Sequence, residues 1–167
     1  VFGNREEGGE KWLDTDHPLS WWLCKIQRKD GRFVPKPGYE NHPVVAVTWF
    51  GAKAFCDYYG WQLPTEIEWE KAARGTDGRI YPWGNQSPDC TIANYVGKSG
   101  NIFCVGDTSK VGSYPDGASP YGALDLAGNV WEWVADWYGD YPSSPQPNPK
   151  GPATGQSHVL RGGSWRD

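Results

Sequence analysis

Residues Gly122–Trp133 read GALDLAGNVWEW and contain the densest chemical pattern in this chain of 167 residues. Three oxygen-bearing side chains, those of Asp125, Asn129 and Glu132, lie close together around a glycine that can make a sharp turn. Oxygen ligands from one short irregular segment, with backbone carbonyls between them, suit a cation of the size of calcium. A tight turn with solvated carboxylates fits the same residues, and the spacing of an EF-hand is absent. From spacing alone, both interpretations stay open.

The end of this segment predicts a β-strand. Trp131 and Trp133 alternate with Glu132 and Val134, which is the period of a strand with two unlike faces.

Four further short sequence motifs accompany this segment. They are HPVVAVTW at 42–49, LPTEIEWEKAARG at 63–75, YPWGN at 81–85 and VLRGGSW at 159–165. Together and in this order, the five motifs closely resemble those of the formylglycine-generating enzyme family, also called the sulfatase-modifying factor family. The resemblance covers residues 42–167 and is thin before His42. We therefore expect one domain of this family over 1–167, truncated at both ends.

The resemblance implies a C-type-lectin-like α+β fold that is rich in loops, with two short helices and small antiparallel sheets. Composition agrees independently: 22 Gly, 14 Pro and 11 Trp favour extended loops pinned by large rings over a helical bundle. A mean hydropathy of -0.69 and the lack of a long apolar run predict no membrane span. A net charge of -4 without a basic cluster excludes a nucleic-acid-binding surface.

The first predicted helix follows Val44–Trp49, which reads as a strand running into it. Thr48 is the expected N-cap, and Gly60 stands just past the expected end. One buried face is predicted by the spacing i, i+3, i+4, i+7 of Ala52, Phe55, Cys56 and Tyr59.

The second predicted helix begins after Thr65, where Glu68 completes a capping box, and ends at Gly75. Its apolar stripe consists of Trp69, Ala72 and Ala73.

The four cysteines permit three pairings and show no Cys-x-x-Cys spacing, which argues against a zinc site. Cys90 and Cys104 bracket a Gly-rich loop, and we predict a disulfide between them. Closing a loop of about fifteen residues contributes ~3 kcal/mol in the chain-entropy model. Cys56 is expected to be an inert thiol. A disulfide belongs to an oxidising compartment. We therefore expect a periplasmic or secreted protein, although this chain contains no targeting segment.

The resemblance implies two calcium sites. Carried over onto this sequence, the ligands of one site are Asp125, the carbonyls of Gly128 and Val130, and Glu132. The other site begins at Asn94 and the carbonyl of Tyr95. Its remaining ligands should lie near 101–106, where this chain is shorter and has no clear Asp.

Catalytic members of the family oxidise a sulfatase cysteine to formylglycine with molecular oxygen and a copper ion held by two thiolates. The first of these cysteines follows the Gly-Gly-Ser word after two residues, and this chain has Asp167 there. A carboxylate does not replace a thiolate for Cu(I). The second cysteine would lie beyond Asp167. We expect Trp131, Ser164, Trp165 and Asp167 to line a hollow that could take a ligand.

The leading prediction is therefore a non-catalytic, calcium-stabilised binding or accessory module, acting on a protein or small-ligand partner or within a larger assembly. The resemblance also implies an alternative, an oxidase that converts a sulfatase cysteine to formylglycine with copper and oxygen. Related domains on this scaffold include iron-dependent sulfoxide synthases, variable binding proteins of diversity-generating retroelements and modules appended to bacterial kinases.

Overall fold

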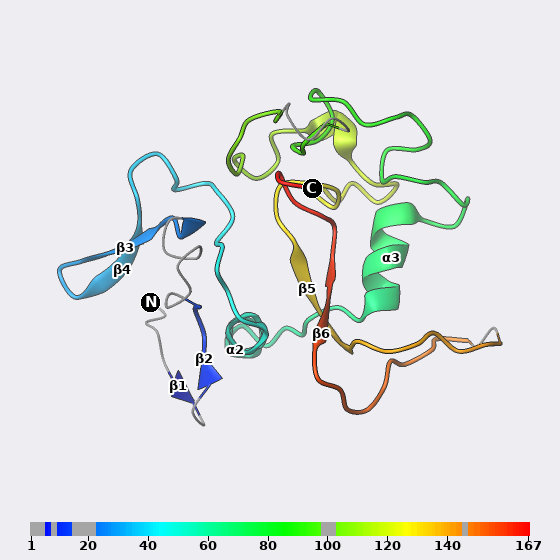
Figure 1. Cartoon of the computed structure of the whole chain (residues 1–167), viewed down its shortest axis with the longest axis horizontal. Coiled ribbons are helices and arrows are strands. Elements are labelled where there is room, and N and C mark those ends of the chain that lie inside the picture. Colours follow the sequence, from blue (N-terminus) through cyan, green and yellow to red (C-terminus); the bar gives the residue numbers. More distant parts are fainter. Residues whose placement is uncertain (1–5, 8–9, 15–22, 98–102, 145–146) are drawn as a thin grey trace. The chain divides into compact units, whose positions relative to one another are not determined.

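The computed structural model describes residues 6–7, 10–14, 23–97, 103–144 and 147–167 (Figure 1). The chain divides into two compact units, Val1–Leu63 and Pro64–Asp167. None of the helices in the described ranges is long and apolar enough to cross a bilayer.

The first unit contains two antiparallel pairs of strands. They are β1 (Glu6–Glu7) with β2 (Glu10–Lys11), and β3 (Ile26–Lys29) with β4 (Arg32–Pro35). Asp30 and Gly31 join β3 to β4 with φ angles of 50° and 74°, as the tight two-residue turns of twisted hairpins require. The predicted strand at Val44–Trp49 is wrong: only Val47 forms a bridge, with Leu13. Ala46, at a φ of 60°, interrupts the extended backbone.

Helix α2 (Trp49–Tyr58) begins as predicted, because the Thr48 hydroxyl accepts the N–H of Gly51 at 3.0 Å. Its predicted buried face is wrong, since Phe55 is 44% exposed and Tyr59 is 51% exposed. The helix instead turns Gly51 inward, where a Cβ atom would come within 2.2 Å of the Trp12 carbonyl oxygen. On this face of α2, close contact between the backbones of Gly51 and Trp12 therefore takes the place of packing by large side chains.

The second unit is built around helix α3 (Glu66–Arg74), strand β5 (Glu132–Trp137) and strand β6 (His158–Arg161), with a short 3₁₀ turn η1 (Pro115–Gly117). Both bonds of the predicted capping box at Thr65 are present. The two strands pair antiparallel, and α3 packs against them (Figure 1). The buried core between them consists of Trp69, Ala73, Leu126, Val134 and Val159.

The predicted strand at the end of Gly122–Trp133 is confirmed in β5, which begins at Glu132, one residue after Trp131. Val134 is fully buried, whereas Trp131 is 46% exposed. The strand therefore turns Val134 into the core, whereas the other residues of β5 on both faces are half-buried.

Asn129 joins three distant segments to the loop that precedes β5. It is 2% exposed. Its Oδ1 accepts the N–H of Ser109 at 2.8 Å, and its Nδ2 donates to the Ser109 carbonyl at 3.3 Å. Its backbone N–H donates to the Asn94 carbonyl at 2.8 Å, and its carbonyl accepts the N–H of Trp165 at 3.0 Å. We call these four contacts the Asn129 junction.

The junction restricts which residues can occupy this turn. Asn129 has a φ of 63°, a left-handed conformation that asparagine tolerates better than most residues. Gly128 has a φ of 84°, and a Cβ atom there would lie 2.4 Å from the Asn94 carbonyl oxygen. Its N–H donates to the Gly162 carbonyl at 2.8 Å. The Gly-Asn pair is thus dictated by backbone geometry and by buried hydrogen bonding.

We predict that Asn129→Ala lowers the free energy of unfolding by about 3 kcal/mol. It leaves the buried N–H and carbonyl of Ser109 unsatisfied, at ~1–3 kcal/mol for each group, and places alanine in a left-handed conformation. Urea denaturation measures the change. Asn148→Ala is the matched control, because Asn148 is exposed and also has a positive φ of 47°. Equal losses in both variants would show that only the backbone conformation matters.

Candidate functional site

Asp125 and Glu132 flank the loop that contains the Asn129 junction. Asp125 has a φ of 59°, and its Oδ2 accepts the N–H of Gly112 at 2.6 Å. Glu132 Oε2 accepts the indole N–H of Trp69 at 2.6 Å. Each of the two predicted carboxylate ligands therefore accepts a hydrogen bond from a residue of the second unit that is distant in the sequence.

Among the described residues, none of the groups that shift the pKa of Glu132 is a cation. Burial raises the pKa of Glu132, the hydrogen bond from Trp69 opposes that shift, and the nearby Asp125 carboxylate adds to it. Burial and the neighbouring Asp125 carboxylate both disfavour the ionised form of Glu132. A cation between the two carboxylates would reverse the effect. The Arg161 guanidinium lies over the Trp69 ring, 4.9 Å from its centroid.

Backbone oxygens approach the same region. A Cβ atom on Gly162 would lie 3.8 Å from the carbonyl oxygen of Val130 and 3.6 Å from that of Leu126. Val130 was a predicted ligand. The Leu126 carbonyl was not, because every residue has a backbone carbonyl and the residue type does not show which one faces a site. A side chain at position 162 would thus contact both carbonyl oxygens.

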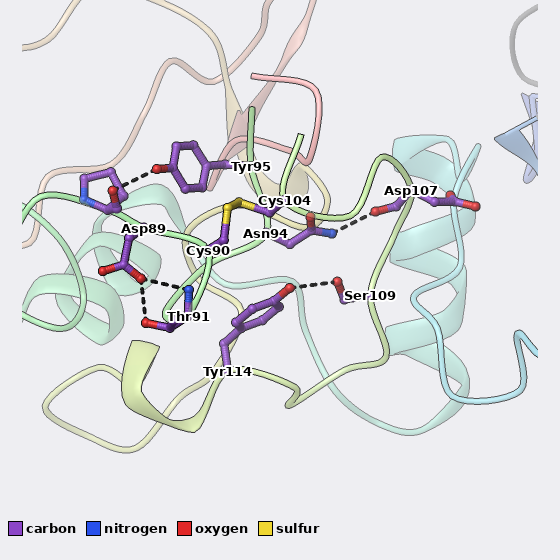
Figure 2. Close-up of a disulfide and its surroundings, with 10 residues drawn as sticks. Asp89, Cys90, Thr91, Asn94, Tyr95, Cys104, Asp107, Ser109 and Tyr114 are labelled. Carbon is purple, nitrogen blue, oxygen red and sulfur yellow. Dashed lines mark hydrogen bonds between the residues drawn. A yellow bond between two sulfur atoms is a disulfide. The ribbon is translucent and has the colours of Figure 1, made fainter. Parts of the chain in front are cut away.

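The second predicted cation site contains an unsatisfied buried oxygen. Asn94 is 1% exposed, and its Oδ1 has no hydrogen-bond partner. Its Nδ2 donates to the carbonyl of Asp107 at 2.8 Å (Figure 2). The carbonyl of Tyr95 accepts the N–H of Cys104 at 3.1 Å. Asp107, one residue past the range in which further ligands were expected, was missed by the sequence analysis.

An unsatisfied buried amide oxygen is uncommon in folded proteins and calls for an explanation. Bound calcium accepts amide and carbonyl oxygens as ligands. The oxygen chemistry around Asn94 therefore fits such an ion. Among the residues that the structure describes, no three His, Cys, Asp or Glu side chains gather as a metal-binding group. Carbonyl and amide oxygens would have to complete either site.

Three of the four predicted pocket residues share one hydrogen-bonded cluster. Asp167 Oδ2 accepts the indole N–H of Trp131 at 2.9 Å and the hydroxyl of Ser164 at 2.5 Å. The fourth, Trp165, is buried and packs its ring against Phe103, with centroids 5.9 Å apart. We call Trp131, Ser164 and Asp167 the Asp167 cluster.

The predicted disulfide is confirmed: Cys90 and Cys104 are bonded, with Cα atoms 5.1 Å apart (Figure 2). Among the described residues, Cys24 and Cys56 are free thiols of the first unit. Burial raises the pKa of the Cys56 thiol, with a smaller contribution from Asp57. A raised pKa reduces the thiolate fraction, in line with the expected inertness of Cys56.

Comparison with known proteins assigns the chain to a family. Residues 6–167 match the family described as sulfatase-modifying factor enzyme 1-like domain. Serine/threonine-protein kinase pkn1 of Chlamydia pneumoniae is 45% identical over 147 residues, which cover 85% of this chain and 22% of the kinase. The formylglycine-generating enzyme of Thermomonospora curvata is 42% identical over 187 residues, covering 99% of this chain and 60% of the enzyme. The chain thus spans less than two thirds of either relative.

A solved structure agrees with these relatives. Treponema denticola variable protein 1 superimposes with a TM-score of 0.61 at 27% sequence identity, covering 79% of this chain and 64% of that protein. The predicted loop-rich α+β, C-type-lectin-like fold of the formylglycine-generating enzyme type is confirmed. Since the family match extends over both units and includes the loops around Asn94, Asn129 and Asp167, this chain belongs to the sulfatase-modifying factor enzyme 1-like domain family.

Proposed function

We propose that this chain is a non-catalytic, calcium-stabilised binding or accessory module of an extracytoplasmic protein. The observation that carries the proposal is the Asp167 cluster. A carboxylate stands where the resemblance to catalytic members requires the first copper thiolate, and Trp131 and Ser164 both donate to it.

The donor set does not fit copper held by two thiolates. Cu(I) prefers soft sulfur ligands, whereas Asp167 offers a hard oxygen. Cys90 and Cys104 are bonded to each other, so neither provides a thiolate in the second unit. These residues therefore provide no thiolate pair for a copper-dependent reaction.

The donor set does fit calcium. Asp125, Glu132 and the carbonyls of Gly128 and Val130 would hold one ion. The Asn94 amide oxygen and the carbonyl of Tyr95 would contribute to a second. Hard oxygen ligands from loops are the ligands that calcium takes in proteins. Its part here would be structural, because an ion offsets the repulsion between Asp125 and Glu132 and satisfies the buried Asn94 oxygen. An ion that binds only the folded state stabilises it by mass action.

A binding role is supported by the half-exposed Trp131, whose ring lies beside the polar Ser164 and Asp167. An amphipathic aromatic ring next to a carboxylate can contact a protein or small-ligand partner through both apolar and polar groups. The similarity to a region covering 22% of a kinase agrees with a module within a larger protein. The disulfide supports an oxidising compartment.

We predict that chelation lowers the melting temperature of the wild-type protein and lowers that of Glu132→Gln by less, because the variant loses the site at Asp125 and Glu132 and keeps the site at Asn94. At a hundredfold excess over Kd, one ion contributes about 2.7 kcal/mol. In chelator, the glutamine variant should be at least as stable as wild type, because burial raises the pKa of Glu132 and so disfavours its charged form. Differential scanning calorimetry with calcium and with chelator measures both effects.

Asp140→Asn serves as the control, since Asp140 is an exposed carboxylate of the same unit, and it should keep the full response to chelation. A wild-type melting temperature that ignores both calcium and chelator would contradict the calcium part of the proposal.

We also predict that the full-length protein does not oxidise a sulfatase-type cysteine peptide in the presence of Cu(I) and oxygen. Mass spectrometry of the peptide would detect conversion of the thiol to an aldehyde. Asp167→Cys should restore turnover only where a second cysteine follows Asp167 in the protein, because copper needs a pair of thiolates. Aldehyde formation by the wild-type protein would favour the oxidase over the binding module.

A further inference from the structure

The Cys90–Cys104 disulfide fastens two arms of chain, 90–97 and 103–107, to each other. Next to the disulfide, the N–H of Cys104 donates to the carbonyl of Tyr95 at 3.1 Å. The covalent bond, which Figure 2 shows, and this backbone hydrogen bond hold the second arm against the first.

Both arms also contact the segment that carries the Asp167 cluster. In the first arm, the N–H of Val96 donates to the carbonyl of Asp167 at 3.1 Å. In the second arm, the ring of Phe103 packs against Trp165. Val96 and Phe103 pair with each other in an antiparallel bridge. Separating the arms would therefore disturb the backbone of Asp167 and the packing of Trp165 together.

The same arms hold the two partners at the Asn94 site. Asn94 belongs to the first arm, and Asp107, whose carbonyl accepts the Asn94 Nδ2, ends the second. The unsatisfied Asn94 Oδ1 lies on the same side-chain amide. The orientation of this oxygen therefore depends on the position of the second arm, which the disulfide fixes.

The disulfide is open to small reductants. Cys90 is exposed and Cys104 is half-buried. Attack by an external thiolate requires access to one sulfur, and a dithiol completes the reaction by forming its own disulfide. Two electrons and two protons pass from the dithiol to the protein, the S–S bond breaks, and two protein thiols result.

We propose that the Cys90–Cys104 disulfide is a redox-sensitive clamp on the Asn94 site and the Asp167 cluster. In the oxidised protein the arms stay paired, the Asn94 oxygen is held for a cation, and Asp167 stays in reach of Trp131. Reduction by a dithiol releases the second arm, weakens calcium binding and loosens the Asp167 cluster. The calcium part of this inference rests on the proposed function, whereas the effect on Asp167 does not.

Calcium titration by calorimetry on the oxidised and the dithiothreitol-reduced full-length protein tests the first effect. Reduction should weaken calcium binding about tenfold or more, as expected when the groups that orient a ligand are released. The indole N–H resonance of Trp131, assigned by its loss in Trp131→Phe, tests the second effect. It should shift on reduction and return on reoxidation. The double variant Cys90→Ser with Cys104→Ser should reproduce the reduced state without a reductant.

The double variant Cys24→Ser with Cys56→Ser is the control, because both thiols are free, and it should keep the redox response. An unchanged calcium affinity and an unchanged Trp131 resonance in folded, reduced protein would overturn the clamp. Global unfolding on reduction would also overturn it, since the disulfide would then stabilise the whole fold. If calcium binds neither form, the calcium proposal fails, and the Trp131 resonance still decides whether Asp167 is clamped.

Discussion

The buried side chain of Asn129 is the constraint on which the loops of the second unit depend. One asparagine hydrogen-bonds to both backbone groups of Ser109, to Asn94 and to Trp165. In a unit with one helix packed on two short strands, few regular hydrogen bonds fix the loops. Buried side-chain to backbone bonds have to replace them, and each is costly to leave unmade.

The junction also connects the candidate sites to one another. Asn129 lies between Asp125 and Glu132 in the sequence. Its backbone N–H donates to the carbonyl of Asn94, and its carbonyl accepts the N–H of Trp165, two residues from Asp167. The side chain of Asn129 holds the segment of Ser109, and its backbone holds those of Asn94 and Trp165. A shift in any of these segments must therefore be accommodated at the same residue. Contacts of this kind give two sites a physical route by which occupancy of one changes the affinity of the other.

Capping residues, residue alternation and short sequence motifs predicted a large part of the fold. The capping box at Thr65, the strand after Gly122–Trp133 and the pairing of Cys90 with Cys104 follow from residue chemistry over short distances and agree with the structure. The buried face of α2 was wrong because periodicity shows which residues share a face and not what covers it. The unsatisfied oxygen of Asn94 depends on a contact with Asp107, which no local pattern encodes.

Native-state hydrogen exchange tests the Asn129 junction most directly. If the junction holds the loops as one unit, the amides of Ser109, Asn129 and Trp165 should exchange through a common opening with one free energy, and Asn129→Ala should lower that free energy for all three together. Independent exchange of Ser109 or Trp165 at the rate of an exposed loop would contradict the account.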